Sequence, residues 1–248
     1  MSDSERMGFA RNSKHIRNQI FIPKYYDPGI DIILSTLRSS HKLVSVASLE
    51  ARGMIEVATG IEVGKLAYGT GEVAFIRSSD LADWELAGQP KQRVSESLYQ
   101  RLRKRVDIEP EDLLLVRDGT YLVGTTVVIT ASDAHSLYAG GLYKIHCPRP
   151  ELFDPYLLLA LFNTPIVKRQ MRSKQFTRDS IDTLGRRLFE LVIPVPKSAG
   201  RRARIADVTR KVVEERVLLR DRAKSLAIGI EGVELDEEER DLARSVGI

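Results

Sequence analysis

The segment Leu113–Val116 is a continuous aliphatic run that ends in a turn of hydrogen-bonding side chains. Arg117 and Asp118 follow it at once, and Thr120 and Tyr121 come after one glycine. A strand of continuous aliphatics packs on both faces and holds the next residues rigidly, where polar groups can discriminate between partners. The segment is therefore a candidate recognition turn, and an ordinary charged turn that closes a strand is the alternative.

Two further segments carry side chains of the same kinds. Val73–Ile76 is a second apolar run that leads into Arg77, and Gln175 lies in a basic stretch farther along. Arginine can bind guanine O6 and N7 with two parallel hydrogen bonds, and glutamine can bind adenine in the same way, a geometry worth roughly 1 to 3 kcal/mol of discrimination. The candidates for reading base edges are therefore Arg77, Arg117 and Gln175.

Other side chains are better suited to positioning a nucleic acid than to reading it. Hydroxyl groups bind phosphate oxygens or make secondary base contacts. The hydroxyl-bearing candidates are Ser78, Ser79, Thr120, Tyr121, Thr125 and Thr177. The charged groups of Lys168, Arg172 and Lys174 would add attraction that falls with salt concentration.

Two neighbours of the candidate readers have more than one interpretation. Phe176 lies in a polar stretch and would either contact a thymine methyl group or pack into the core. Asp118 would accept a hydrogen bond from cytosine N4, orient Arg117, or bond the backbone of its own turn. We favour core packing for Phe176 and an orienting or turn-bonding role for Asp118.

Residues that could perform catalysis do not converge in this sequence. Gly69-Thr-Gly71 lacks the rest of a dinucleotide-binding or phosphate-binding loop. The Asn/Asp-Pro-Pro-Tyr/Phe string of adenine methyltransferases is missing, as is the Glu-x-Lys string of the common restriction nucleases. Cys147 is the single cysteine, and the four histidines have no zinc-binding spacing. We therefore expect a protein that is not an enzyme and has no metal site and no cofactor.

Charge is distributed unevenly along the 248 residues. Lys and Arg total 38 against 34 Asp and Glu, so the net charge alone argues only mildly for a polyanionic partner. Basic residues gather between 168 and 204, ahead of an acidic stretch from 231 to 241, which favours a basic face on the body of the chain; a solvated helix face is the alternative. The N-terminus does not resemble a signal sequence, and no apolar run approaches the ~18 residues that span a bilayer, so we expect a cytoplasmic protein without membrane attachment.

The pattern of apolar residues predicts a mixture of short strands and helices. Helices are expected from 28 to 39, from 94 to 106, and as a broken helix after Asp154-Pro155 and Thr164-Pro165. Short strands and turns are expected from 43 to 76, and strands up to 116, from 122 to 130, and from 137 to 146. Gly140-Gly141 interrupts the last of these and indicates a bulge or a close backbone approach.

A long helix without Gly or Pro is predicted from about 203 to 227. Apolar residues recur along it at steps of three, four and seven, as in a coiled coil. The predicted oligomer or partner interface consists of Ile205, Val208, Val212, Leu219 and Leu226. Glu215 and Arg222 stand at two expected core positions, so a helix packed only on its own domain is an equal alternative.

Four segments in a fixed order carry a family resemblance. They are Pro23–Pro28, Val73–Leu81, Asp112–Tyr121 and Phe189–Pro196, with the basic helix that follows. In this order they resemble the target-recognition domain of type I restriction-modification specificity (S) subunits, a domain that is also attached to some restriction-associated DNA methyltransferases. The resemblance extends to about Leu226. It implies double-stranded DNA as ligand, no catalysis in this chain, and S-adenosylmethionine and ATP/Mg chemistry in partner subunits.

The resemblance also implies a domain organisation. We expect an α+β fold in which an irregular mixed β-sheet or partial barrel is followed by a long coiled-coil-like helix. The expected parts are a flexible N-terminus (1–19), a DNA target-recognition domain (20–200), a helical spacer or dimerisation helix (201–230) and an acidic C-terminal tail (231–248). The family usually has two recognition domains and this chain has one, so it should pair with itself or with a second half-subunit.

Partners follow from the same resemblance, as do two alternatives. A DNA adenine methyltransferase (modification) subunit is the expected partner, with a restriction subunit in a complete type I system. A targeting component for another phage-defence methyltransferase would share the domain but not the assembly. From a different class comes an interaction module whose basic face binds an acidic protein or RNA. A stand-alone nuclease is the weakest alternative.

Overall fold

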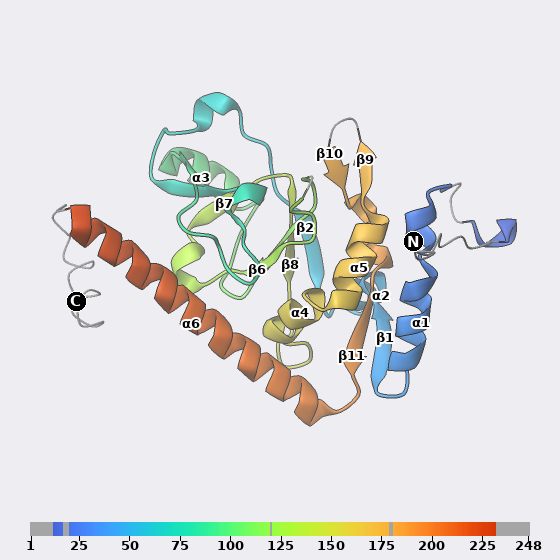
Figure 1. The fold of residues 1–248 in the computed structure, drawn as a ribbon. Helices are drawn as coiled ribbons and strands as arrows, with labels where there is room; N and C mark the ends of the chain where they lie inside the picture. The colour runs from blue at the N-terminus through green and yellow to red at the C-terminus, as the bar shows by residue number, and fades with distance from the viewer. Residues whose placement is uncertain (1–11, 17–19, 120, 179–180, 232–248) are drawn as a thin grey trace, which may run out of the picture.

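The longest aliphatic run of the sequence forms the central strand of the molecule. The computed structural model describes residues 12–16, 20–119, 121–178 and 181–231 (Figure 1). Most of the expected flexible N-terminus and almost all of the expected acidic tail lie outside them. The strand is β5 (Leu113–Val116), and it pairs antiparallel with β8 (Leu142–His146) on one side and β6 (Thr126–Val128) on the other. β2 (Glu56–Thr59) extends this sheet beyond β8.

Both faces of β5 are buried, in two different hydrophobic clusters. Leu113 and Leu115 point into a cluster with four helices, α1 (Pro28–Leu37), α2 (Val46–Ala51), α4 (Pro155–Phe162) and α5 (Pro165–Lys174). Leu114 and Val116 point into a second cluster, with Phe75 and Leu137. A continuous aliphatic run is typical of a strand covered on both faces, because alternate side chains leave the sheet in opposite directions.

The second cluster is built on a smaller, mixed sheet. Its strand order is β4 (Gln92–Val94), β3 (Val73–Ile76), β7 (Ser136–Tyr138), with β3 and β7 parallel. The sequence predicted one interrupted strand from 137 to 146, but the chain leaves the small sheet after β7 and enters the large one at β8. Near this crossing a Cβ atom on Gly60 would clash with the carbonyl oxygens of Tyr138 and Ala139, so the backbones approach closely there. At the predicted positions, Gly140 and Gly141, an added Cβ would first meet the side chains of Glu62 and Ser78.

Short helices cover the first cluster. Asp27 caps α1 (Pro28–Leu37) by accepting from the Gly29 N–H, as the sequence predicted. α2 (Val46–Ala51) was not predicted, because the stretch from 43 to 76 was expected to hold only strands and turns. Its cap is Ser45, whose hydroxyl accepts from the Ser48 N–H. α3 (Glu96–Leu102) lies beside the small sheet and is shorter than predicted.

The broken helix expected after residue 154 is confirmed as two helices. Asp154 accepts hydrogen bonds from the N–H groups of Tyr156 and Leu157 and so begins α4 (Pro155–Phe162), which is buried almost all round. Pro165 begins α5 (Pro165–Lys174) after a short break. Proline suits the first turn of a helix, because the N–H that it lacks would have no partner there.

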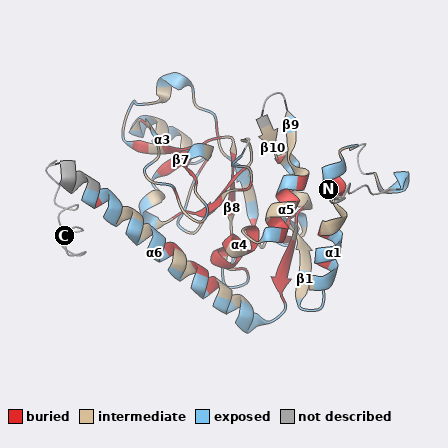
Figure 2. Ribbon diagram, in the orientation of Figure 1, coloured by how far each residue is buried: buried red, intermediate tan, exposed pale blue. Residues whose placement is uncertain are grey.

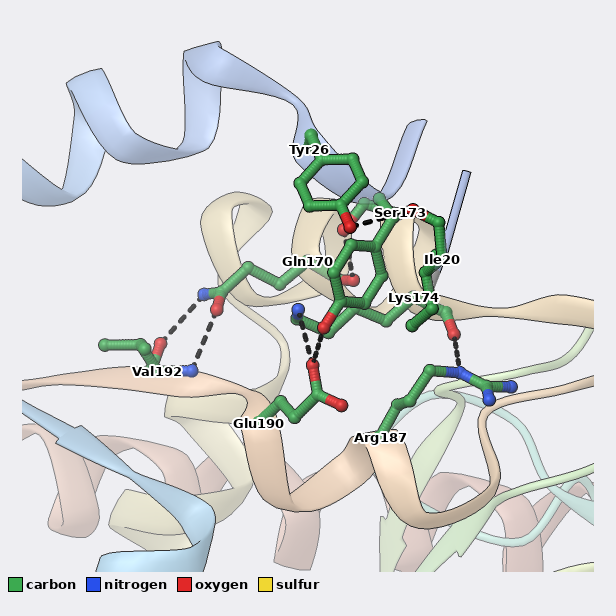
Figure 3. Close-up of polar contacts among 9 residues, drawn as sticks. Ile20, Tyr26, Gln170, Ser173, Lys174, Arg187, Glu190 and Val192 are labelled. Atoms are coloured by element: carbon green, nitrogen blue, oxygen red, sulfur yellow. Dashed lines mark hydrogen bonds and ion pairs between the residues drawn. The ribbon is translucent and has the colours of Figure 1, made fainter. Parts of the chain in front are cut away.

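A buried glutamine joins α5 to strand β11 (Val192–Pro196), against which the helix packs. Strand β11 pairs antiparallel with β1 (His41–Ser45). The Gln170 side chain, 1% exposed, donates to the Val192 carbonyl and accepts from the Val192 N–H, both at 2.8 Å (Figure 3). A side-chain amide that meets both backbone groups of one residue fixes the position of the helix along the strand.

A long helix, α6 (Ala199–Glu231), runs along one side of the molecule and packs on α4 (Figure 1). Its buried residues are Ala206, Thr209 and Val213, at helical spacing, and Ser225 farther along. Most of the length of α6 carries exposed residues (Figure 2). The predicted seam is largely exposed: Val208, Leu219 and Leu226 are 54%, 61% and 49% exposed, and Val212 is half-buried. Ile205, also predicted for the seam, packs against the body of the domain instead.

Two predictions were made for α6, a coiled-coil-like seam and packing on its own domain, and they concern different faces of the helix. The helix does pack on its own domain, but through residues that the heptad pattern did not select. Glu215 and Arg222, the polar residues at expected seam positions, are exposed. An apolar row interrupted by charges is thus left facing outward.

Replacing Gln170 with Ala should lower the free energy of unfolding by about 1 to 3 kcal/mol, because the variant loses both hydrogen bonds to the Val192 backbone. Urea unfolding followed by circular dichroism measures the change. The matched control is Arg172→Ala, an exposed position on the same helix, which should change the free energy by no more than about 0.5 kcal/mol. Equal effects of the two substitutions would contradict the role given to Gln170.

Candidate nucleic-acid interface

The turns that follow β3 and β5 meet at one edge of the molecule. The N–H groups of Arg117 and Asp118 both donate to the carbonyl of Gly141, at 2.9 and 3.1 Å. The Ser78 hydroxyl, just past β3, donates to the Asp118 carbonyl at 3.2 Å. Two segments that lie 40 residues apart in the sequence, and that the sequence singled out separately, are thus joined by hydrogen bonds.

A short hairpin, which the sequence did not predict, completes this edge. It consists of β9 (Phe176–Arg178) and β10 (Ile181–Thr183). The Gly119 N–H donates to the Asp182 carbonyl and the Leu184 N–H donates to the Arg117 carbonyl, each at 2.9 Å. We call the set Arg77, Ser78, Arg117, Asp118, Gln175, Thr177 and Asp182 the tip cluster.

Arg117 is held by its neighbour. Both its Nε and its Nη2 donate to one carboxylate oxygen of Asp118, at 2.8 and 2.6 Å, and its guanidinium carbon lies 5.6 Å from the centre of the Tyr143 ring. Burial lowers the pKa of Arg117, but the hydrogen bonds and charge of Asp118 outweigh it and the net shift is upward. Asp118 thus occupies one edge of the guanidinium, and the Nη1–Nη2 end remains for a partner. Two parallel donors at that end match guanine O6 and N7.

Gln175 and Thr177 share one acceptor, the carboxylate of Asp182. The Gln175 amide nitrogen donates to one oxygen at 3.2 Å, and the Thr177 hydroxyl donates to the other at 2.6 Å. Gln175 is half-buried and Thr177 is exposed. Both side chains therefore lie at the surface in fixed positions.

Arg77 is held less completely. Its backbone N–H donates to the Asp80 carboxylate at 2.8 Å, and its guanidinium carbon lies 5.9 Å from the centre of the Tyr68 ring. Its Nε is buried without a hydrogen-bond partner among the described residues. A buried donor without a partner is costly, so this group is a candidate for an interaction that the isolated chain does not make. Ser79 is exposed beside it.

Two of the lysines predicted to attract phosphates interact with the protein itself. Lys168 donates to the Asp83 carboxylate at 2.9 Å and to the Gly124 carbonyl at 2.8 Å. Lys174 lies 3.1 Å from Glu190 (Figure 3), and 4.2 Å from the centre of the Tyr25 ring. The sequence showed their charge but not the acidic groups that the fold brings to them.

Two arginines offer more accessible charge than these lysines. Arg172, on α5, and Arg186, in the 3-10 turn η6 (Gly185–Glu190), are both exposed. Arg186 lies close enough to Tyr143 for its charge to act on that ring, which also faces Arg117. Arg186 therefore adds exposed positive charge near the tip cluster.

The remaining predicted site residues have mixed surroundings. Phe176 packs between the guanidinium of Arg187, 4.1 Å from its ring centre, and the Tyr25 ring, at 5.9 Å, so it lies in a packed contact. Tyr121 is 96% exposed and Thr125 is half-buried. Thr120 lies outside the described residues.

Sequence reasoning missed two residues that support the tip cluster. Asp182 lies in a hairpin whose three-residue strands are too short for a readable apolar alternation. Arg187 was counted only as one basic residue among many, but its Nε donates to the Lys174 carbonyl at 2.6 Å (Figure 3). Its Nη2 donates to the Thr183 carbonyl at 2.9 Å. It thus joins the end of α5 to the end of β10. Burial lowers the pKa of Arg187.

The described residues offer little for catalysis. No group of His, Cys, Asp and Glu within them could hold a metal ion. Burial raises the pKa of Cys147 to about 12, so its thiol is not a reactive nucleophile. A cleft of about 1420 Å³ lies between α6 and the 82–90 loop, but ion pairs such as Arg216–Glu85, at 3.0 Å, line it and hold the helix to the body. None of the helices in the described ranges combines the length and apolarity needed to cross a bilayer.

Comparison with solved structures places the fold. No protein-family model matches the sequence, and no curated protein does. The S subunit of a type I restriction-modification system from M. genitalium is 13% identical and aligns over 80% of this chain and 47% of its own, with a TM-score of 0.52. The HsdS subunit from Thermoanaerobacter tengcongensis (16% identity, 88% and 48%, TM-score 0.43) and a chain from a study of complex assembly and conformational transition of the type I R-M system (14%, 88% and 49%, 0.47) also match.

The likeness to the M. genitalium structure shows the fold of this chain. The resemblance predicted from the sequence is confirmed at that level, as is the expected α+β class with a long C-terminal helix. This chain spans about half the length of the solved structures that it matches. The chain therefore has the fold of a type I restriction-modification S subunit, over about one half of that subunit.

Proposed function

We propose that this chain is a DNA sequence-specificity subunit of half-subunit form, which directs a partner methyltransferase, and a restriction subunit where one is present, to its target. The observation that carries the proposal is the convergence of Arg77, Arg117 and Gln175 on one edge of a domain with the S-subunit fold. Arginine and glutamine are the side chains best suited to paired hydrogen bonds with base edges. Rigid strands and carboxylates hold two of them in place, which base discrimination requires.

In this proposal the chain supplies recognition and its partners supply the reaction. A DNA adenine methyltransferase subunit would bind S-adenosylmethionine, and a restriction subunit would use ATP and Mg. The chain itself would act in the cytoplasm, where these subunits meet the DNA. The same domain would serve equally if the methyltransferase belonged to another phage-defence system.

A single recognition domain reads half of a bipartite site, so the proposal includes pairing through α6. The exposed apolar row at Val208, Leu219 and Leu226 supports this part, because such residues gain most from burial against a second helix. A second copy of the chain would give a twofold assembly and a palindromic target, and a second half-subunit an asymmetric one. A helix rises ~1.5 Å per residue, so the length of α6 would set the distance between half-sites.

The decisive experiment combines co-purification with mapping of methylated adenines. The chain should purify with the methyltransferase encoded by a neighbouring gene, and adenines in one specific sequence of the host genome should be methylated only when the chain is present. Methylation that persists without the chain would exclude the specificity role. A preference for single-stranded RNA over duplex DNA at matched salt would favour an RNA-binding module instead.

Arg117→Ala should relax base choice at one position of the target by about 1 to 3 kcal/mol while affinity for other duplexes changes less, because the two donors that match guanine are lost. Selection from a pool of random duplexes, followed by sequencing of bound DNA, measures the base preference. The matched control is Arg172→Ala, which should weaken all duplexes alike and lower the slope of log affinity against log salt by about 1. If both variants behave alike, the division between readers and positioning residues is wrong.

Leu219→Asp should convert a paired chain into a monomer in light scattering, because a buried charge in the seam would have no partner. The side chain is exposed in the single chain, so the helical content should stay unchanged. Ala203→Asp, which adds the same charge at an exposed position of α6 outside the seam, is the control and should leave the mass unchanged. An unchanged mass for Leu219→Asp would reject this face as the interface.

A further inference from the structure

We propose that Asp182 is a specificity-determining positioning residue: its carboxylate fixes the amide of Gln175 in the single orientation that selects adenine. The inference rests on the proposed function and adds a residue and a base to it. Asp182 need not touch DNA in this role. It acts through Gln175, which would make the contact.

The chemistry of a carboxylate determines which end of the amide faces it. An ionised carboxylate only accepts hydrogen bonds, so the amide nitrogen of Gln175, and not its oxygen, must point to Asp182. The observed pair, Nε2 to Oδ2 at 3.2 Å, has this arrangement. Rotation of the amide by 180° would place two acceptors against each other and is disfavoured. A free glutamine has no such preference and could present either end.

The fixed orientation leaves a defined pair of groups for a partner. One hydrogen of the amide nitrogen is used by Asp182, so the second hydrogen and the amide oxygen remain. A donor and an acceptor side by side match adenine, which offers the N7 acceptor and the N6 amino donor in the major groove. Guanine offers two acceptors there, N7 and O6, and would meet the Gln175 oxygen with a repulsive contact.

Asp182 is itself held on two further sides. Its second carboxylate oxygen accepts from the Thr177 hydroxyl at 2.6 Å, across the β9–β10 pairing that sets Asp182 opposite Thr177. Its backbone carbonyl accepts from the Gly119 N–H at 2.9 Å, in the turn that carries Arg117. The carboxylate is therefore a fixed reference point, and the reader Gln175 is tied to the same turn as the reader Arg117.

These contacts separate the orienting role from a purely structural one. The bond to Gly119 uses the backbone of Asp182, so a side-chain substitution leaves the connection between hairpin and turn in place. The bond to Thr177 can be removed on its own from the threonine side. A substitution at Asp182 should therefore change which base is chosen at one position, without changing the rest of the recognition sequence.

The test is selection of bound sequences from a pool of random duplexes by the full-length chain, alone and together with the methyltransferase subunit encoded beside it. The wild type should show one position where adenine is preferred about fivefold or more, as a paired glutamine contact provides, and Gln175→Ala should abolish the preference there alone. Asp182→Ala should relax the same position to within about twofold, because the amide can then rotate. The double variant should be no more relaxed than either single one.

Two control variants make the result specific. Asp207→Ala removes an exposed carboxylate from α6, outside the tip cluster, and should retain the adenine preference. Asp182→Asn can place its own amide nitrogen against the Gln175 oxygen, so it should lose adenine selection although it is almost the same size. Thermal unfolding of each variant, followed by circular dichroism, should match the wild type.

The outcomes distinguish this inference from the function on which it rests. A wild type without any sequence preference would overturn the proposed function. A wild type with a preferred sequence, in which Asp182→Ala or Asp182→Asn keeps its adenine, would overturn the orienting role and leave the function standing. A loss of preference at every position at once would assign Asp182 to the stability of the hairpin and would equally overturn the inference.

Discussion

The burial of β5 on both faces is the constraint on which the rest of the structure depends. Its four aliphatic side chains alternate between two hydrophobic clusters, so the strand cannot slide or rotate without exposing one of them. The residue after the strand, Arg117, therefore begins its turn at a fixed place. The Gly141 carbonyl, from the neighbouring strand end, then accepts from the first two N–H groups of that turn. The packing of the two apolar clusters thus fixes the position of the polar turn that begins at Arg117.

Two carboxylates then hold the side chains of Arg117 and Gln175 in place at this edge. Asp118 takes one edge of the Arg117 guanidinium, and Asp182 takes one hydrogen of the Gln175 amide. In each case an acidic group that cannot donate leaves a basic or amide group with a defined set of free donors and acceptors. Long side chains lose entropy on binding, and groups held in advance lose less of it. An acidic residue among candidate DNA-reading groups is therefore consistent with recognition.

The helix α6 shows how one element can satisfy two demands. Its narrow buried stripe of Ala206, Thr209 and Val213 lets it lie close against α4. The apolar seam that the heptad pattern selects is turned outward, and charged residues interrupt it. A helix with apolar residues on both a buried stripe and an exposed one has weak amphipathic contrast.

The sequence by itself determined the elements whose signals are local. The aliphatic run of β5 follows from burial, and the starts of α1 and α4 follow from their Asp-Pro caps. The stretch from 203 to 227 within α6 follows from the absence of Gly and Pro there, and each of these elements was predicted. The order of the motifs also indicated the fold.

Tertiary structure alone decided the conformation of the shortest elements, because α2 and the β9–β10 hairpin are too brief to show a periodic pattern of apolar residues. It also decided which positive charges are available to a ligand. Lys168 pairs with Asp83 and Lys174 with Glu190, and no local sequence pattern encodes either pair. Asp182 acquires its neighbours in the same way, since only folding brings its carbonyl to Gly119.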